Sequence, residues 1–209
     1  LYDSPELCNR AYAETSAVVN MMHQVVCKNL AKAEFIVGLL CAMTRASERD
    51  HDRNVQGLIA EAMWIAETMR ALLFSAEQQA EKDQWGYFVP QRTPLDTARN
   101  LFPKQYPRLV EIVQLLGSSS LVATPCQADL SNDLGDYVEK YFQLANLGSQ
   151  DRISLFRLAH EVAVSGFGGR QQLYERFFFG PPDVMASIFF NLYQKEPFVD
   201  RVEELLARS

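Results

Sequence analysis

A run of small, aromatic and basic residues is the part of this sequence best suited to bind a ligand. Residues 163–177 read AVSGFGGRQQLYERF and include three glycines and Arg170. Glycine lets the backbone approach a ligand closely, and the N–H groups that open the next helix, expected at residues 171–179, are hydrogen-bond donors with a partial positive charge. Such a junction could bind a flat cofactor with an anionic tail. A plain helix break, capped by Gly168 or Gly169, is the alternative.

A second polar segment, residues 114–120, reads QLLGSSS and follows an apolar helical pattern. Gln114, Gly117 and Ser118 are of types that suit ligand binding at a helix end. Simple helix termination at Gly117 explains the same pattern equally well.

Residues that could do catalysis are scarce. The sequence has no P-loop, nucleophile elbow or HExxH motif, and no Glu-x-x-His pair of the di-iron type. His23 and Cys27 share a helix face at a spacing that metal ligands use. Two ligands do not make a site, and the other histidines are distant in sequence, so packing is favoured over metal binding. We therefore assign neither a catalytic residue nor a metal.

Composition limits the class of protein. The 209 residues are 48% hydrophobic and 22% charged, enough for one sizeable core, and the net charge of −6 argues against binding to nucleic acid or to anionic membranes. No apolar run could span a bilayer, and the start lacks a signal pattern, so we expect a soluble cytoplasmic protein. The four cysteines are widely spaced, which makes disulfides unexpected. Because the chain begins at Leu1, we expect a piece of something longer.

Helical periodicity runs through almost the whole chain, which predicts one all-α unit. Residues 5–45 and 52–83 are each expected to form one long helix, and together an antiparallel hairpin. A short helix is expected to start near Thr93. No strand or internal repeat is predicted, and long helices with apolar stripes on more than one side indicate an oligomer. Further helices are expected at residues 103–116, 133–142, 149–165, 171–179, 182–193 and 198–207.

Several motifs, in their order and spacing, resemble the C-terminal domain of the 4-hydroxyphenylacetate 3-monooxygenase and chlorophenol 4-monooxygenase family. These are two-component, FAD-dependent aromatic hydroxylases with an acyl-CoA-dehydrogenase-like fold. The resemblance spans nearly the whole chain. The segments that carry it are HQ at 23–24, AKAEF at 31–35, RALL at 70–73, YPRLVEIVQLLG at 106–117, DRISLFRLA at 151–159 and FGGRQQLYERF at 167–177.

The resemblance implies what the residues alone do not show. The fold would be a long-helix bundle like the C-terminal four-helix domain of acyl-CoA dehydrogenases, with extra C-terminal helices, assembled as a homotetramer. Reduced FAD (FADH2) would come from a separate flavin reductase, react with O2 to a C4a-hydroperoxide, and hydroxylate a phenolic substrate. Residues 1–209 would be the cofactor-contacting bundle, without the family's N-terminal helical and middle β domains, where most residues that handle the phenol lie.

The resemblance also places the candidate cofactor-binding residues. One group matches the family's loop beside the flavin, and the other occupies the turn where related dehydrogenases hold FAD across a subunit interface. Arg170 would pair with a flavin carbonyl or phosphate, because a guanidinium presents fixed paired donors. The two groups are Ser165, Phe167, Gly168, Gly169 and Arg170, and Gln114, Gly117 and Ser118.

Two other readings stay open. A FAD- and iron–sulfur-dependent 4-hydroxybutyryl-CoA dehydratase is similar in fold, but it would need further N-terminal ligands. A non-catalytic helical oligomerisation module would have kept the bundle after losing the catalytic domains.

Overall fold

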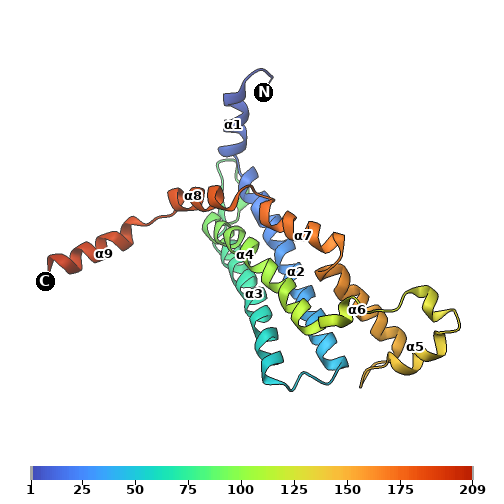
Figure 1. Ribbon diagram of the computed structural model, residues 1–209. Coiled ribbons are helices and arrows are strands. Elements are labelled where there is room, and N and C mark those ends of the chain that lie inside the picture. Colours follow the sequence, from blue (N-terminus) through green and yellow to red (C-terminus); the bar gives the residue numbers. More distant parts are fainter. Residues whose placement is uncertain (1, 209) are drawn as a thin grey trace.

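The computed structural model describes residues 2–208, and nearly all of its regular structure is helical (Figure 1). The helices and strands are α1 (Pro5–Ala13), α2 (Ala17–Ala46), α3 (Arg53–Gln78), β1 (Glu81–Lys82), β2 (Phe88–Val89), α4 (Arg92–Gly117), α5 (Gly135–Tyr141), α6 (Ser149–Ala163), α7 (Gly166–Phe177), α8 (Pro182–Leu192) and α9 (Glu196–Ala207). Two short 3-10 turns, η1 (Ser118–Leu121) and η2 (Gln127–Leu130), lie between α4 and α5. The predicted all-α bundle is confirmed.

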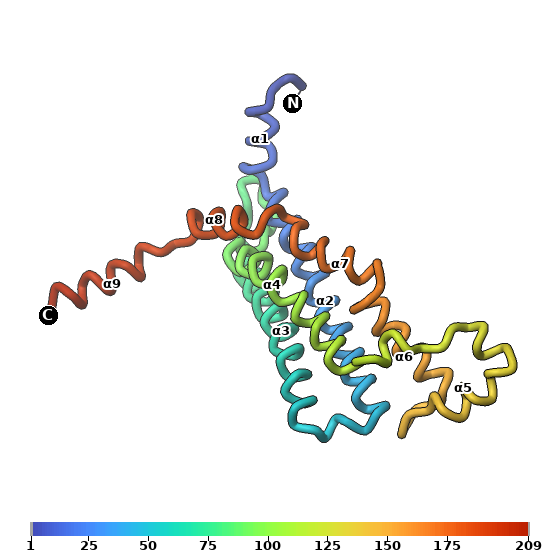
Figure 2. The backbone as a smooth tube through the Cα atoms, viewed as in Figure 1, coloured from blue at the N-terminus to red at the C-terminus, as the bar shows by residue number. Residues whose placement is uncertain are grey.

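Three long helices, α2, α3 and α4, pack on one another and form the centre of the bundle (Figure 2). Their apolar residues recur at the helical period and are almost fully buried, as Met22, Met69 and Phe102 illustrate. Burying each such side chain stabilises the fold by roughly 1.5–3 kcal/mol. The helices α6 and α7 pack on α4 and on each other, and Phe156 of α6 belongs to the same core.

The predicted single helix over residues 5–45 is wrong, because the chain breaks between α1 and α2. Thr15 donates its hydroxyl to Ala11 O at 2.8 Å, and Ser16 donates its hydroxyl to Asp83 Oδ2 at the same distance. Short hydroxyl side chains compete in this way with the helical hydrogen bonds. None of the residues of α1 is buried, and Figure 1 shows α1 extending beyond the end of the bundle.

The prediction of no strand, and of a helix reaching residue 83, is also wrong. The helix α3 ends at Gln78, and β1 pairs antiparallel with β2 in the short hairpin that follows. Asp83 shapes its turn by accepting hydrogen bonds from Trp85 N at 2.9 Å and Tyr87 N at 3.0 Å. Gly86 supplies the positive φ of 86° that the turn needs.

The helix α4 begins at Arg92, eleven residues before the predicted start at 103, so the prediction of two separate helices is wrong. It contains Pro103 and Pro107 in its interior. An interior proline costs about 3 kcal/mol. The cost is outweighed here because Leu95, Phe102 and Leu109 are fully buried on both sides of the prolines.

The C-terminal part follows the predicted helices closely, with α6, α8 and α9 near their expected bounds. The last two helices form an arm, in which α8 still contacts α4 and α9 points away from the bundle (Figure 1). Neither α8 nor α9 has a buried residue. Among the described helices, none combines the length and the apolar character that crossing a membrane requires.

Candidate functional site

The two segments that the sequence singles out lie against each other in the fold. Gln114, near the end of α4, donates its side-chain amide to the carbonyl of Ala163 at 2.7 Å. Ala163 is the last residue of α6, two residues before the Ser165 that caps α7. One hydrogen bond thus joins the polar end of α4 to the start of the glycine-rich segment.

The turn after α4 is built by close packing. A Cβ on Gly117 would lie only 2.5 Å from the buried side chain of Leu121, so glycine is needed there. Ser118 takes a left-handed φ of 48° and donates its N–H to Gln114 O. His160 of α6 approaches the carbonyl of Leu121 at 2.8 Å through Nδ1. Packing against Leu121 therefore explains why residue 117 is a glycine. Ser118, the next residue, is exposed.

The glycine-rich segment is not a loop but the first turns of α7, which begins at Gly166 and not near residue 171. Ser165 is the N-cap, and its hydroxyl accepts a hydrogen bond from Gly168 N at 3.1 Å. The prediction of a loop gave the three glycines too much weight, because a serine cap and packing against α6 outweigh their low helix propensity.

The three glycines in the first turn of α7 differ in how closely they pack against α6. A Cβ on Gly168 would lie 2.6 Å from the carbonyl oxygen of Val162, so Gly168 lets α7 pass close to α6. Nothing lies within 4 Å of the corresponding position on Gly166 or Gly169. Gly168 is thus required by the fold, whereas Gly166 and Gly169 leave backbone accessible to a ligand.

The exposed side of this turn has the chemistry of a binding surface for an anionic planar group. The Phe167 ring is 57% exposed, and Arg170 is also exposed one turn further on. The N-terminus of α7 adds backbone donors and a partial positive charge. An aromatic face, a guanidinium and open backbone at Gly169 fit a flavin nucleotide.

A buried ion cluster lies further along α7, around Glu175. Glu175, only 5% exposed, accepts hydrogen bonds from Lys28 Nζ at 2.7 Å to each of its carboxylate oxygens, and a further one from Lys32. Lys32 also donates to Gln171 Oε1 at 2.6 Å. Because both lysines belong to α2, the cluster fixes the rotation of α7 about its axis.

Burial and charge change the acidity of the groups around this cluster. Burial lowers the pKa of Lys28, while the hydrogen bond to Glu175 opposes the shift. Burial, with a smaller contribution from the Glu175 charge, raises the pKa of Tyr106 to about 12. Lys28 Nζ also lies 4.6 Å from the centre of the Tyr174 ring, a cation–π contact. Tyr106 therefore stays protonated further into the alkaline range than an exposed tyrosine would.

The sequence analysis did not identify this cluster. A signal was present: Lys28 and Lys32 are four residues apart, and so are Gln171 and Glu175. Each pair shares one helix face, and the two lysines are opposite in charge to Glu175. What the sequence does not show is that α2 and α7 lie side by side.

Comparison with known proteins defines the class of this bundle. The family model HpaB, "4-hydroxyphenylacetate 3-hydroxylase C terminal", matches residues 8–207. The chain is 44% identical over 204 residues to the 4-hydroxyphenylacetate 3-monooxygenase oxygenase component of Thermus thermophilus, which covers 98% of this chain and 42% of that protein. It is 30% identical over 212 residues to the Escherichia coli oxygenase component, covering 100% and 41%.

The chain therefore belongs to the 4-hydroxyphenylacetate 3-hydroxylase family, which confirms the resemblance predicted from its motifs. It spans about two fifths of the length of the curated relatives that it matches, 42% and 41% in the first two.

Solved structures agree with this assignment. A crystal structure of an oxygenase component (HpaB) of 4-hydroxyphenylacetate 3-monooxygenase, complexed with FAD and 4-hydroxyphenylacetate, matches with a TM-score of 0.94 and 43% identity over 98% of this chain and 43% of that one. A 4-hydroxybutyryl-CoA dehydratase from N. maritimus matches with a TM-score of 0.79 at 14% identity, over 90% of this chain and 38% of that one. The second likeness shows the fold alone.

The difference between the two neighbouring glycines gives a first prediction. Gly168→Ala should lower the free energy of unfolding by about 1–3 kcal/mol, because the new methyl group meets a backbone carbonyl that cannot move alone. Gly169→Ala should raise it by up to about 1 kcal/mol through helix propensity. Urea denaturation of both variants measures this, and equal effects would contradict the packing argument.

The buried carboxylate gives a second prediction. Glu175→Gln should lower the free energy of unfolding by about 2–4 kcal/mol, because Lys28 and Lys32 lose the carboxylate with which both form ion pairs. Glu139→Gln, on the exposed face of α5, is the matched control and should change it by less than about 0.5 kcal/mol. Chemical denaturation compares the two, and a Glu175→Gln variant as stable as the control would rule out a structural role for the cluster.

Proposed function

We propose that this chain is the C-terminal bundle of a two-component aromatic monooxygenase that uses reduced FAD to hydroxylate a phenolic substrate of the 4-hydroxyphenylacetate or chlorophenol type. The observation that carries the proposal is the likeness, at 43% identity over 98% of the chain, to an oxygenase component solved with FAD and 4-hydroxyphenylacetate. The accessible start of α7 supports it, since its residues fit a flavin nucleotide. An iron–sulfur dehydratase has only a likeness of fold in its favour.

In this proposal the chain's residues bind and orient the cofactor. Arg170 pairs with a flavin carbonyl or phosphate, Phe167 lies against the ring system, and the absence of side chains at Gly166 and Gly169 lets the ligand approach the start of α7 closely. Gln114 and Ser118 meet a flavin from the end of α4. Reduced flavin, when bound, supplies the electrons that activate O2. We assign no catalytic acid or base to residues 1–209, and infer that the phenol is handled by domains outside them.

The partners follow from the same proposal. Reduced FAD comes from a separate NAD(P)H-dependent flavin reductase, and O2 and a phenol are the co-substrates. We infer a cytoplasmic location, where reduced nicotinamide is available to the reductase. Nothing in the net charge of −6 favours nucleic acid or an anionic membrane as a further partner.

We also propose a homotetramer, and the C-terminal arm supports it. The apolar residues Phe198, Val202 and Leu205 recur along one side of α9 at the helical period, and all are more than half exposed. An amphipathic helix without a buried residue needs a partner surface. A second copy of the chain is the partner that the proposed assembly provides.

An enzymatic assay tests the proposed function. The purified full-length protein, supplied with FAD, NADH, O2 and a flavin reductase, should convert 4-hydroxyphenylacetate or a chlorophenol to a ring-hydroxylated product detectable by mass spectrometry. Omitting the reductase should abolish turnover. Dehydration of 4-hydroxybutyryl-CoA, or no turnover of any phenol, would overturn the proposal.

Arg170 should contribute to cofactor affinity. Arg170→Ala removes a charge-assisted hydrogen bond worth about 1.5 kcal/mol or more, so the Kd for reduced FAD should rise about tenfold or more. Arg176→Ala, two turns along the same helix and also exposed, should leave it within about twofold. Anaerobic titration followed by flavin absorbance measures both, and equal losses would indicate a general effect of charge.

The arm should be needed for assembly. Val202→Asp with Leu205→Asp places two charges on the apolar side of α9, and the mass measured by light scattering should fall below that of four chains. Glu203→Lys, on an exposed position of the same helix, should leave the mass unchanged. A tetramer in both variants would show that α9 is not part of the interface.

A further inference from the structure

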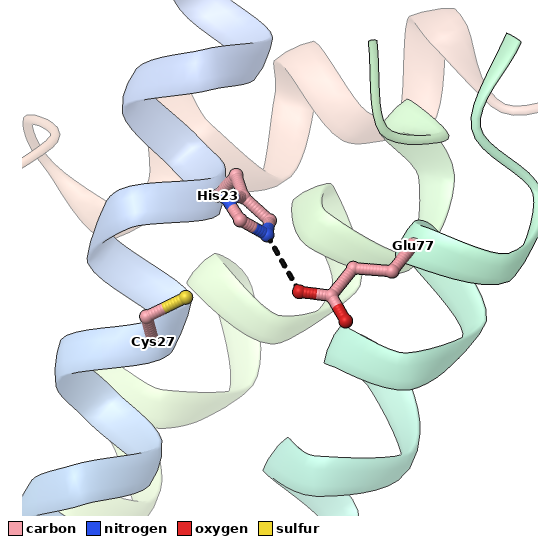
Figure 3. Close-up of side chains that lie close together, drawn as sticks. All are labelled: His23, Cys27 and Glu77. Carbon is pink, nitrogen blue, oxygen red and sulfur yellow. Dashed lines mark hydrogen bonds and ion pairs between the residues drawn. The ribbon is translucent and has the colours of Figure 1, made fainter. Parts of the chain in front are cut away.

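A group of possible metal ligands lies between α2 and α3. The sequence indicated only His23 and Cys27, which follow one another by one turn of α2. The fold adds Glu77 from the last turn of α3, and the three ligand atoms all lie within 4.8 Å of one another. Figure 3 shows the imidazole of His23 pointing at Glu77, with the sulfur of Cys27 directed into the same gap.

The geometry needs only a small adjustment to accept an ion. His23 Nε2 and Glu77 Oε1 are 2.8 Å apart and share a hydrogen bond. Around a tetrahedral zinc ion the ligand atoms stand roughly 3.3–3.8 Å apart, given metal–ligand bonds of about 2.0–2.3 Å. Side-chain rotation can lengthen the His23–Glu77 distance and shorten the distances from both groups to Cys27 Sγ, which brings the three ligand atoms into that range. The backbones can stay in place, since they belong to the long helices α2 and α3.

The donor set selects a particular class of cation. One nitrogen, one sulfur and one carboxylate oxygen suit Zn²⁺ or a similar borderline metal, and not Mg²⁺ or Ca²⁺, which prefer oxygen. The side chains of His23 and Glu77 are 31% and 47% exposed, which leaves room for an ion to enter and for water as a fourth ligand.

We propose that His23, Cys27 and Glu77 form a binding site for Zn²⁺ or a similar divalent transition metal, which links α2 to α3. The ligand atoms are His23 Nε2, Cys27 Sγ and a Glu77 carboxylate oxygen. Binding displaces the thiol proton to solvent and leaves every oxidation state unchanged. A fourth position stays open to water, as in zinc sites with three protein ligands. The inference does not depend on the proposed flavin chemistry.

Cobalt provides a spectroscopic test that needs neither flavin nor substrate. The purified full-length protein, freed of metal with a chelator, should bind one Co²⁺ per chain. A thiolate-to-cobalt charge-transfer band and the intense visible bands of tetrahedral Co²⁺ should appear, and Zn²⁺ should abolish both. Zinc should also raise the Tm. Absence of the charge-transfer band in the wild-type protein would overturn the proposal and leave His23–Glu77 as a hydrogen bond between helices.

Variants locate the site. Cys27→Ser should remove the charge-transfer band, and Glu77→Gln and His23→Asn should each weaken Zn²⁺ binding by more than about tenfold. Cys126→Ser and His51→Asn, which replace exposed residues elsewhere, are matched controls and should keep the full cobalt spectrum. A band that persists in Cys27→Ser would overturn the assignment. Circular dichroism confirms that each variant is folded, since these partly exposed side chains contribute little to the core.

Discussion

The carboxylate of Glu175, held by Lys28 and Lys32, determines which side of α7 faces solvent. Without it, packing against α6 and α4 would restrain α7 less completely about its axis, and the direction in which Phe167 and Arg170 point would be less well defined. Lys28 and Lys32 lie on α2 and the buried Glu175 lies on α7. The ion pairs form only when α7 turns its Glu175 side toward α2, so they favour one rotation of α7 about its axis. The apolar core holds the bundle together, but it is this charged contact that orients the proposed cofactor-binding turn.

The long helices could be predicted because their apolar residues recur at 3.6 residues over many turns, and that signal does not depend on neighbouring segments. The errors lie where a local preference competes with tertiary contacts. The hydroxyl groups of Thr15 and Ser16 end a helix that periodicity alone would continue, and Asp83 organises a hairpin from residues that a helix could equally accommodate. In α4 the reverse holds, since burial keeps Pro103 inside a helix that propensity would end.

The residues of the candidate site were chosen from the sequence, and their role in cofactor binding stays a prediction. These residues lie at the joined ends of α4 and α7, but the separate roles of the glycines depend on distances between helices that a sequence does not contain. Gly168 and Gly169 are adjacent and identical in type, yet one faces Val162 and the other open space. The same limit hid Glu175 from its lysines and Glu77 from His23, since each pair joins residues more than fifty positions apart.

The arm formed by α8 and α9 starts directly after α7, through the short segment 178–181. In the proposed tetramer a neighbouring molecule binds this arm. Because the arm is joined directly to α7, fixing the arm also restrains α7, the helix proposed to contact the cofactor. Assembly and cofactor binding then share one free energy of coupling, and each must strengthen the other by the same factor. Dilution would lower the affinity for flavin, and saturation with flavin would hold the subunits together at concentrations where they otherwise separate.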